Sequence, residues 1–567
     1  MRSKSGQTSQ MPSSDTQGQS STPGEEITRR KFLEFLGRTS VAASSAVVGS
    51  TTLAPIAGLA KTSSKRGGDV SVSTVKPGLK DDLVLASGFR YSVIASCGDK
   101  INSRGDKFGD CADFVCFFPD SREKPTSGTL WVNHEYLLPH LTTDWVIGTP
   151  KSKKQVDTER ELVGGSFIRV ERNAKSGDWR LVQDDKNNRR LSGSTKIPLV
   201  AERDIEGTRT AIGTMANCAG GLTPWGNVLT CEENYQDYYG EVSFDPASGQ
   251  RTWNKTAGYA WVEHYSQPPE HYGWVVEVSP KTGEAKKLVA LGRFAHEGAT
   301  VVVAKNGLPV AYMGDDARDQ CIYKFIGDRA GSLDSGNLYV ANLTAGRWEH
   351  LHVSNPTLAG KFRDQTDLLI RTREAAKLAG GTPCDRPEDV EIDPQTGAVL
   401  VALTNNDARG NLHGSILRIV ESGDDPLARE FKHSTFLTGG AASGFSCPDN
   451  LAFDPRGNLW MTSDISGSKI GKGEHQVFGN NGLFWIPMTG KNAGKVHQIG
   501  YAPVDAEMTG PWFSPDGSTL FVSVQHPGEQ SGSKDQLTSH WPKGGKSLPM
   551  SSIVAIHGPG LERLMQA

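Results

Sequence analysis

Short apolar segments alternate with turn residues along most of the chain, as in LWVNH, VVVA and LFVSV. Glycine is abundant, with 64 residues, and many turns combine it with Pro or Asp. Apolar runs of this length, bounded by such residues, indicate β-strands joined by tight turns. The pattern therefore predicts a β-rich protein and is not typical of a helical bundle.

One unit of two strands recurs six times. Its first strand begins with polar residues, in CADFVCFFPD, CAGGLTPW, HEGATVVVA, PEDVEIDP, PDNLAFDP and MTGPWFSPDG. Its second strand ends in polar or acidic residues, in GTLWVNHEY, NVLTCEEN, PVAYMGDD, AVLVALTNND, NLWMTSD and TLFVSVQHP. Six such units predict an all-β fold, a six-bladed β-propeller whose polar strand ends gather around one axial site. A β-sandwich is the structural alternative, but it does not explain polar residues at the same two places in all six units.

Irregular insertions interrupt the units at residues 137–160, 235–272 and 327–380. Within the last, FRDQTDLLIRTREAAKLAGG has apolar residues at helical spacing and ends in Gly-Gly. This segment predicts one amphipathic helix packed on the propeller, a short helical insertion.

The N-terminal 60 residues are predicted to lie outside the folded domain. Residues 1–27 are rich in Ser, Gln and Gly, which predicts disorder. Arg29-Arg30, followed by an alanine-rich apolar stretch that ends at Ala60, is similar to a twin-arginine export signal with a small-residue cleavage site. We expect residues 61–75 to form a linker, residues 76–567 to form the propeller, and the mature protein to be periplasmic or extracellular without a stable membrane span.

Charge and cysteine usage narrow the possible partners. A formal net charge of −3 gives no reason to expect nucleic acid or an anionic membrane as partner, so a small molecule bound at a local site is favoured. The eight cysteines show no paired framework, although an even number in an exported protein leaves one or two disulfides open. No sequence feature indicates an interface between subunits, so a monomer is expected.

The strand ends bring together many acids. The residues expected around the axis are Asp113, Asn133, His134, Glu135, Asn217, Cys218, Glu232, Glu233, His296, Glu297, Asp315, Asp316, Arg386, Glu388, Asp389, Asp449, Asn450, Asp464 and His526. So many carboxylates cannot stay ionised together without bound cations. Oxygen ligands suit calcium, and a thiolate among them favours a transition metal such as iron or zinc.

Several of these residue types have ordinary structural roles. The acids of the DPxxG-type turns, Asp393, Asp454 and Asp516, are turn formers. Histidines such as His134, His296 and His526 more often pack than bind metal. Cys218, Glu297 and Glu388 are favoured as ligands because each opens a first strand. Strand alternation makes Cys231 and Glu232 face opposite ways, so Cys231 is predicted to be buried packing.

Several motifs together resemble the PhoX-type alkaline phosphatases over about residues 80–530. They are Cys-Ala-Gly-Gly-x-Thr-Pro-Trp-Gly from Cys218, Leu-Thr-Cys-Glu-Glu-Asn from Leu229, Asn133-His134-Glu135, His296-Glu297-Gly298, Arg386-Pro387-Glu388-Asp389 and Gln525-His526-Pro527-Gly528. The resemblance implies a twin-arginine exported propeller that hydrolyses phosphate monoesters, and possibly diesters. It also implies an axial cluster of two ferric ions and several calcium ions bridged by an oxo group.

Carried over by position, the resemblance also implies residue roles. Cys218 would be the iron-ligating thiolate, and the other metal ligands would be Glu135, Glu232, Glu233, Glu297, Asp316, Glu388 and Asp389. Arg386 and Glu388 would be catalytic, with Arg386, Asn217 and His526 binding the substrate. This assignment agrees with the chemistry of phosphoryl transfer. That reaction mainly requires that the substrate be positioned and that the negative charge of its phosphoryl group be neutralised, which metal ions and an arginine can do.

One segment departs from the family pattern, and two other functions remain open. Gly109-Asp110-Cys111-Ala112-Asp113 stands where an asparagine-rich segment is expected, which leaves the role of Asp113 open. A calcium-dependent lactonase is also commonly a six-bladed propeller, but it has no use for Cys218 or Arg386. A non-catalytic binding propeller has no reason to aim many carboxylates down one channel.

Overall fold

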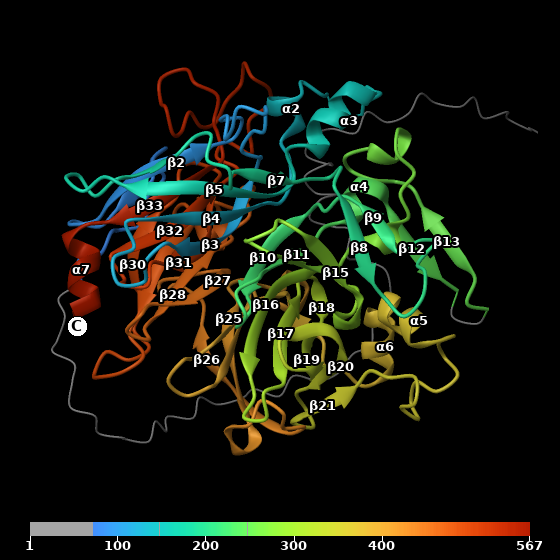
Figure 1. Ribbon diagram of the computed structural model, residues 1–567. Coiled ribbons are helices and arrows are strands. Elements are labelled where there is room, and N and C mark those ends of the chain that lie inside the picture. The colour runs from blue at the N-terminus through green and yellow to red at the C-terminus, as the bar shows by residue number, and fades with distance from the viewer. Residues whose placement is uncertain (1–71, 147, 246–247, 567) are drawn as a thin grey trace, which may run out of the picture.

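The computed structural model describes residues 72–146, 148–245 and 248–566, and here six sheets form the blades of a β-propeller (Figure 1). The innermost strands of successive blades contact one another around a closed ring, from the first blade to the sixth and back. The predicted fold is therefore confirmed. Arg29-Arg30, the expected cleavage site and most of the expected linker lie outside the described residues.

In blades 1 and 3 the strands run from the inside outwards in chain order, whereas in blade 2 the two outermost strands precede the innermost one in the chain. Blade 1 contains β3 (Ala112–Pro119), β4 (Ser127–His134), β5 (Gly164–Arg172), β6 (Trp179–Leu181) and β7 (Arg189–Leu191). Blade 2 contains β10 (Asn217–Leu222), β11 (Val228–Glu232), β14 (Val275–Val278), β15 (Ala285–Leu288), β8 (Lys196–Val200) and β9 (Thr210–Ile212). Blade 3 contains β16 (His296–Val303), β17 (Pro309–Asp315), β19 (Ile322–Arg329), β20 (Ser332–Asn342) and β21 (Arg347–His350).

The last three blades include the strands that close the ring. Blade 4 contains β23 (Pro387–Ile392), β24 (Val399–Leu403), β25 (Ser415–Glu421) and β26 (Phe431–Thr438). Blade 5 contains β27 (Pro448–Phe453), β28 (Leu459–Ser463), β29 (Gly482–Ile486), β30 (His497–Tyr501) and β1 (Val84–Leu85). Blade 6 contains β31 (Glu507–Phe513), β32 (Thr519–Gln525), β33 (Ser552–His557) and β2 (Arg90–Ser96). Because β1 and β2 pair with strands from the C-terminal end, they tie the two ends of the domain together.

The remaining elements lie in the connections. Two small sheets pair β12 (Glu241–Phe244) with β13 (Arg251–Asn254), and β18 (Arg318–Gln320) with β22 (Cys384–Asp385). The helices are α2 (Pro139–Thr142), α3 (Lys153–Arg160), α4 (Gln236–Tyr239), α5 (Gln365–Ile370), α6 (Thr372–Leu378) and α7 (Pro559–Gln566), with 3-10 turns η1 (Trp261–Glu263), η2 (Pro269–His271), η3 (Val289–Leu291), η4 (Asp407–Arg409), η5 (Ser422–Asp424) and η6 (Gly473–Phe478).

The single helix predicted for residues 362–381 is instead two short helices. Helix α5 ends and α6 begins at Arg371, whose backbone is not helical (φ −104°, ψ 37°). The apolar residues of the predicted helix do face the core. Leu368, Leu369, Ala375 and Ala376 are all buried in one hydrophobic cluster. Tertiary packing of both halves against blade 3 and blade 2 side chains outweighs the helical continuity that the local pattern favours.

Every first strand carries a β-bulge near its polar end. In blades 1 to 5 the register shifts by one residue, between Ala112 and Val115, Asn217 and Gly220, His296 and Ala299, Pro387 and Val390, and Pro448 and Leu451. Blade 6 has the corresponding shift between Thr509 and Trp512. A bulge adds one residue opposite the partner strand and re-aims the side chains beside it. The six units therefore share one local distortion as well as one sequence pattern.

The glycine pair of blade 2 packs strands rather than approaching the axial site. A Cβ on Gly221 would lie 2.1 Å from the carbonyl oxygen of Ala299 in the next blade. A Cβ on Gly220 would lie 2.2 Å from the carbonyl oxygen of Leu229 on the neighbouring strand. Both glycines are thus required by the close approach of backbone segments.

Two further findings concern the whole described region. All eight cysteines are in the free thiol form. In the described part of the chain, no helix is long and apolar enough to cross a membrane.

We expect Gly221→Ala to weaken the contact between blades 2 and 3. The added methyl group cannot be accommodated without moving the backbone of Ala299, and overpacking of this kind costs about 1–3 kcal/mol. Thermal unfolding should show a lower midpoint than for the wild type. Val303→Ala, at an exposed position on β16, is the control and should change stability by no more than about 0.5 kcal/mol. An unchanged midpoint for Gly221→Ala would contradict the packing argument.

Candidate metal centre in the axial cavity

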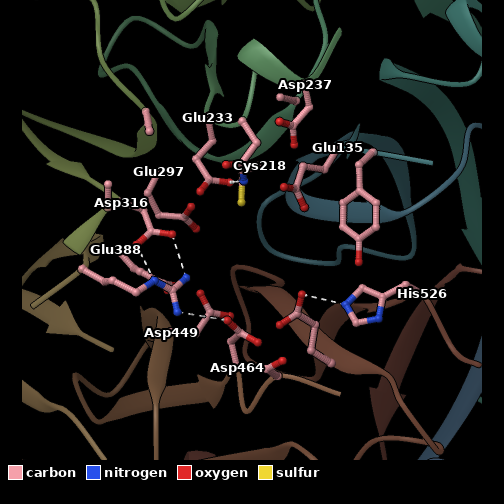
Figure 2. Close-up of a pocket in the computed structure, with 18 of the residues that line it drawn as sticks. Glu135, Cys218, Glu233, Asp237, Glu297, Asp316, Glu388, Asp449, Asp464 and His526 are labelled. Atoms are coloured by element: carbon pink, nitrogen blue, oxygen red, sulfur yellow. Dashed lines mark hydrogen bonds and ion pairs between the residues drawn. The ribbon is translucent and has the colours of Figure 1, made fainter. Parts of the chain in front are cut away.

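A cavity of about 1240 Å³ opens at the end of the propeller where the first strands begin. Five blades place an acid or a thiol at the first bulged residue of the innermost strand, and all five line the cavity: Asp113, Cys218, Glu297, Glu388 and Asp449. Figure 2 shows Cys218, Glu297, Glu388 and Asp449 pointing into a common space. Blade 6 has Gly510 at the same position of its own bulge, so it contributes no such side chain there.

The second strands supply another set of side chains, each one residue beyond the strand end. Glu135, Glu233, Asp316 and Asp464 follow β4, β11, β17 and β28, and His526 follows β32. In blades 1, 2, 3 and 5 this residue comes directly after the one that pairs with the head of the first strand. In these four blades the antiparallel hairpin thus brings two candidate ligands to one place.

Three overlapping groups of these side chains have spacing suitable for metal ions. They are Asp113, Glu135 and Cys218; then Cys218, Glu233 and Glu297; then Glu297, Asp316 and Glu388. Within each group the ligand atoms lie within 4.8 Å of one another. Because Cys218 belongs to the first two groups and Glu297 to the last two, the geometry suits adjacent ions with shared ligands.

The electrostatics also favour bound cations. Burial raises the pKa of Asp113 to about 8, with a further contribution from the Glu135 carboxylate. Burial likewise raises the pKa of Glu135 to about 7, and it raises the pKa values of Glu297 and Cys218 well above their usual ranges. Without cations these groups retain protons at neutral pH, and a metal ion must displace them.

Amide side chains hold the ligands in position without adding charge. Gln525 Nε2 donates to Asp113 Oδ2 at 2.7 Å and to Glu135 Oε2 at 2.9 Å. Asn450 Nδ2 donates to Asp449 Oδ1 at 2.9 Å and to Glu297 Oε1 at 3.4 Å. Buried Asp113 Oδ1 has no hydrogen-bond partner among the described residues, which leaves one oxygen available as a ligand. The residues present therefore fit a metal cluster.

Arg386 lies at the wall of the cavity, bound to three carboxylates. Its guanidinium is 2.8 Å from Asp316 Oδ2, 2.6 Å from Glu388 Oε1 and 3.4 Å from Asp464 Oδ2. Although burial lowers the pKa of arginine, these neighbours raise the pKa of Arg386 well above its usual value. Arg386 is thus a permanent cation whose planar donors face the same space as the metal ligands.

His526 and Glu507 form an ion pair at the cavity wall, and Figure 2 shows the His526 ring on the side of the cavity away from Glu388. Glu507 Oε1 is 2.9 Å from His526 Nε2, and both line the cavity. Burial lowers the pKa of His526, but the carboxylates of Glu529 and Glu507 outweigh it and raise that pKa to about 10. Sequence reasoning missed Glu507, although its position at the polar start of the sixth first strand is the signal that identified the other acids.

Three of the residues to which the family resemblance assigns a metal or substrate role are not in the cavity lining. Glu232 Oε1 pairs with the fully buried Lys287 at 2.6 Å, and its Oε2 accepts from the backbone of Gly273. Asn217 Nδ2 donates to the hydroxyls of Thr214 and Thr230. Asp389 accepts from the backbone N–H groups of Val390 and Leu451, so it joins blades 4 and 5.

The other candidates divide between packing and the site. His134 and His296 are buried, with ring nitrogens near the backbone carbonyls of Asp110 and Gly292. Cys231 is fully buried in a hydrophobic cluster, as predicted. In the unusual first-blade segment, Asp110 accepts from the backbone N–H of Cys111, whose side chain packs against Leu138 and Leu141, while Asp113 faces the metal ligands.

The comparisons with known proteins agree with this geometry. A family model described as alkaline phosphatase PhoX matches residues 70–528. The solved structure of Pseudomonas fluorescens PhoX in complex with vanadate, a transition state analogue, is 29% identical, with a TM-score of 0.76, covering 86% of this chain and 99% of that one. A gluconolactonase from Xanthomonas campestris is 9% identical over 87% of this chain and 99% of its own, with a TM-score of 0.31. Among curated proteins, none matches the chain.

We expect the adjacent substitutions Glu232→Gln and Glu233→Gln to have different effects. Glu232→Gln leaves the buried Lys287 ammonium uncompensated, which costs about 3–5 kcal/mol, so thermal stability should fall while the folded protein keeps its metal. Glu233→Gln removes a candidate ligand and should lower the metal content measured by elemental analysis. Metal loss in Glu232→Gln with unchanged stability would show that this carboxylate acts at the cluster.

Proposed function

The chain belongs to the alkaline phosphatase PhoX family and is a metal-dependent phosphoric ester hydrolase, and from this premise we propose that it hydrolyses phosphate monoesters at an iron and calcium cluster in the axial cavity. The observation that carries the proposal is the chain of three ligand groups joined by Cys218 and Glu297 beside Arg386.

The ligand types support an assignment of the ions. The two groups that share Cys218 contain a thiolate donor, which favours ferric iron, and the group of Glu297, Asp316 and Glu388 has only oxygen ligands, which suits calcium. Glu135 and Glu233 would complete the iron sites. Bound cations would neutralise the carboxylates and polarise the oxygens of a phosphoryl group.

Arg386 is the residue proposed to hold the phosphate. Its guanidinium forms ion pairs with Asp316, Glu388 and Asp464. Cations that bind those carboxylates would weaken these ion pairs and leave the guanidinium free for two parallel hydrogen bonds to phosphate oxygens. Vanadate bound to the Pseudomonas fluorescens protein supports a phosphoryl-transfer site of this kind. Glu388 would act both as a ligand and as the group that orients Arg386.

His526 is proposed as a second cation for the substrate. With its pKa raised to about 10, it carries a positive charge at the alkaline pH where such an enzyme works. Its Nδ1 lies 2.9 Å from the carbonyl oxygen of Asp505 and its Nε2 binds Glu507, so the ring is held in one orientation. It is therefore suited to stabilise negative charge at the leaving oxygen.

Export and assembly remain proposals from the sequence. The Arg29-Arg30 motif supports twin-arginine export to the periplasm or beyond, a route that carries proteins already folded around their metals. We propose that the enzyme acts as a monomer on small phosphoesters.

We expect hydrolysis of p-nitrophenyl phosphate at alkaline pH to require metal. Treatment with a chelator should abolish turnover because the buried acids then lose their counter-charges, and added calcium should restore it if iron is retained at Cys218. Elemental analysis before and after chelation identifies the ions that leave. If activity survives complete removal of metal, the cluster has no part in the reaction; if no metal state is active, lactone substrates become the alternative.

We expect Arg386→Ala to lower kcat by about 100-fold or more while the metal content is retained, since removal of one preorganised donor to a developing charge has an effect of this size. Arg180→Ala, at a highly exposed arginine on β6, is the matched control and should keep wild-type turnover. Full activity of Arg386→Ala would remove this residue from the mechanism.

A further inference from the structure

Apart from Arg386, His526 and Arg373, which is paired with Asp315, three cationic side chains line the same cavity. They are Arg318, Lys469 and Lys472, named here the outer basic site. Arg318 begins β18 two residues after Asp316, and Lys469 lies five residues after Asp464. The same two chain segments therefore carry a carboxylate of the cluster and, farther along, a cation.

The outer basic site has an excess of positive charge. One lining carboxylate lies between two of the cations: Asp407 Oδ2 is 2.5 Å from Lys469 Nζ and 3.6 Å from Arg318 Nη2. Lys472 Nζ donates to the carbonyl oxygen of Ser468. A second lining carboxylate, Glu529, lies beside Gly467 of the same loop, so three cations against two acids leave a local charge of about +1, in a chain whose formal net charge is −3.

The blade 2 side of the cavity mouth carries no such excess of cations. There Asp237, Glu241, Asn254 and Thr256 line the cavity, from α4, the β12–β13 sheet and the turn after it. Asp237 is buried, and the Glu241 carboxylate is paired with Arg293 at 2.8 Å. An anionic part of a substrate is therefore attracted to the side of Arg318 and Lys469.

The outer basic site is close enough to the cluster to contact the same molecule. Two residues of extended chain span at most about 7 Å, so the Cα of Arg318 lies within that distance of the Cα of Asp316. Asp316 in turn binds Arg386 at 2.8 Å. Arg318 and Arg386 can therefore bind two groups that lie on the order of 10 Å or less apart. This separation matches that between the two phosphates of a small phosphorylated sugar.

We propose that the outer basic site binds a second phosphate group of the substrate, so that the preferred substrates are phosphate monoesters that carry another phosphate. This inference rests on the proposed function of the cluster. Arg318 offers two parallel donors to a phosphate and Lys469 a mobile point charge. The half-exposed pair of Lys469 and Asp407 is worth little, so the lysine exchanges its partner at small cost.

The exposed loop between Asp464 and Lys469 supports the same interpretation. Ser466 and Ser468 line the cavity, and their hydroxyls lie 3.2 Å apart. These hydroxyls stand on the path between the cluster and the outer basic site, where they can bind the hydroxyl groups of a sugar linker.

We expect the metal-loaded enzyme to hydrolyse fructose 1,6-bisphosphate with a kcat/KM at least 10-fold above that for fructose 6-phosphate, mainly through a lower KM. The double variant Arg318→Gln/Lys469→Gln should bring this ratio close to two, the value that two equivalent phosphates give. Asp407→Asn should raise the ratio because it removes the competing carboxylate, a change that a merely structural role would not produce. Added salt should lower the wild-type ratio.

Lys432→Gln, at an exposed position on β26 outside the cavity lining, is the control and should keep the wild-type ratio. The outer basic site is overturned if the wild-type ratio of the two kcat/KM values is near two and neither the double variant nor Asp407→Asn changes it. In that case the cluster still hydrolyses both sugars. If the metal-loaded wild type hydrolyses neither of the two sugars nor p-nitrophenyl phosphate, the proposed function is overturned instead.

Discussion

Repulsion among buried acids is the constraint on which this structure depends. Nine carboxylates and one thiol from the innermost hairpins of the six blades are among the side chains that line a single cavity, where burial and mutual repulsion raise the pKa values of most of them. In the described part of the chain, Arg386 and His526 are the cations that pair directly with them, and two positive charges cannot balance nine acids. The protein therefore holds a site that reaches electrical balance by retaining protons or by binding multivalent cations.

The closed ring makes such a concentration of charge mechanically possible. Strands β1 and β2, from the N-terminal end of the domain, pair on blades 5 and 6, so the blades cannot spread to relieve the repulsion. Within each hairpin the bulge turns its first residue towards the axis, and in blades 4 and 5 it turns the second towards the next blade. Asp389 and Asn450 use that position to bind the backbone of the neighbouring innermost strand. The same distortion thus supplies a ligand and a contact between blades.

Charge also organises the approach to the cluster. The acids of the inner cavity favour cations, and in the proposed function the neutralised cluster together with Arg386 would attract phosphate. Farther out, the segments after β17 and β28 carry Arg318 and Lys469. An anionic substrate would meet these cations on one side before it reaches the cluster, which would provide orientation in addition to attraction.

The sequence by itself determined the strands, their sixfold repetition and most of the polar positions that line the cavity, because period-two alternation and turn residues are local properties of the chain. All six predicted pairs of strands are present, and Cys218, Glu135, Glu233, Glu297, Asp316 and Glu388 face one cavity. The sequence could not decide between neighbours such as Glu232 and Glu233, or between Glu388 and Asp389. Along a strand, adjacent side chains point to opposite faces. Which of the two faces the axis depends on bulges and on distant partners such as Lys287. Only the tertiary structure decided those orientations, the inclusion of Glu507, the break at Arg371 and the closure of the ring, since each arises from contacts between segments far apart in the chain.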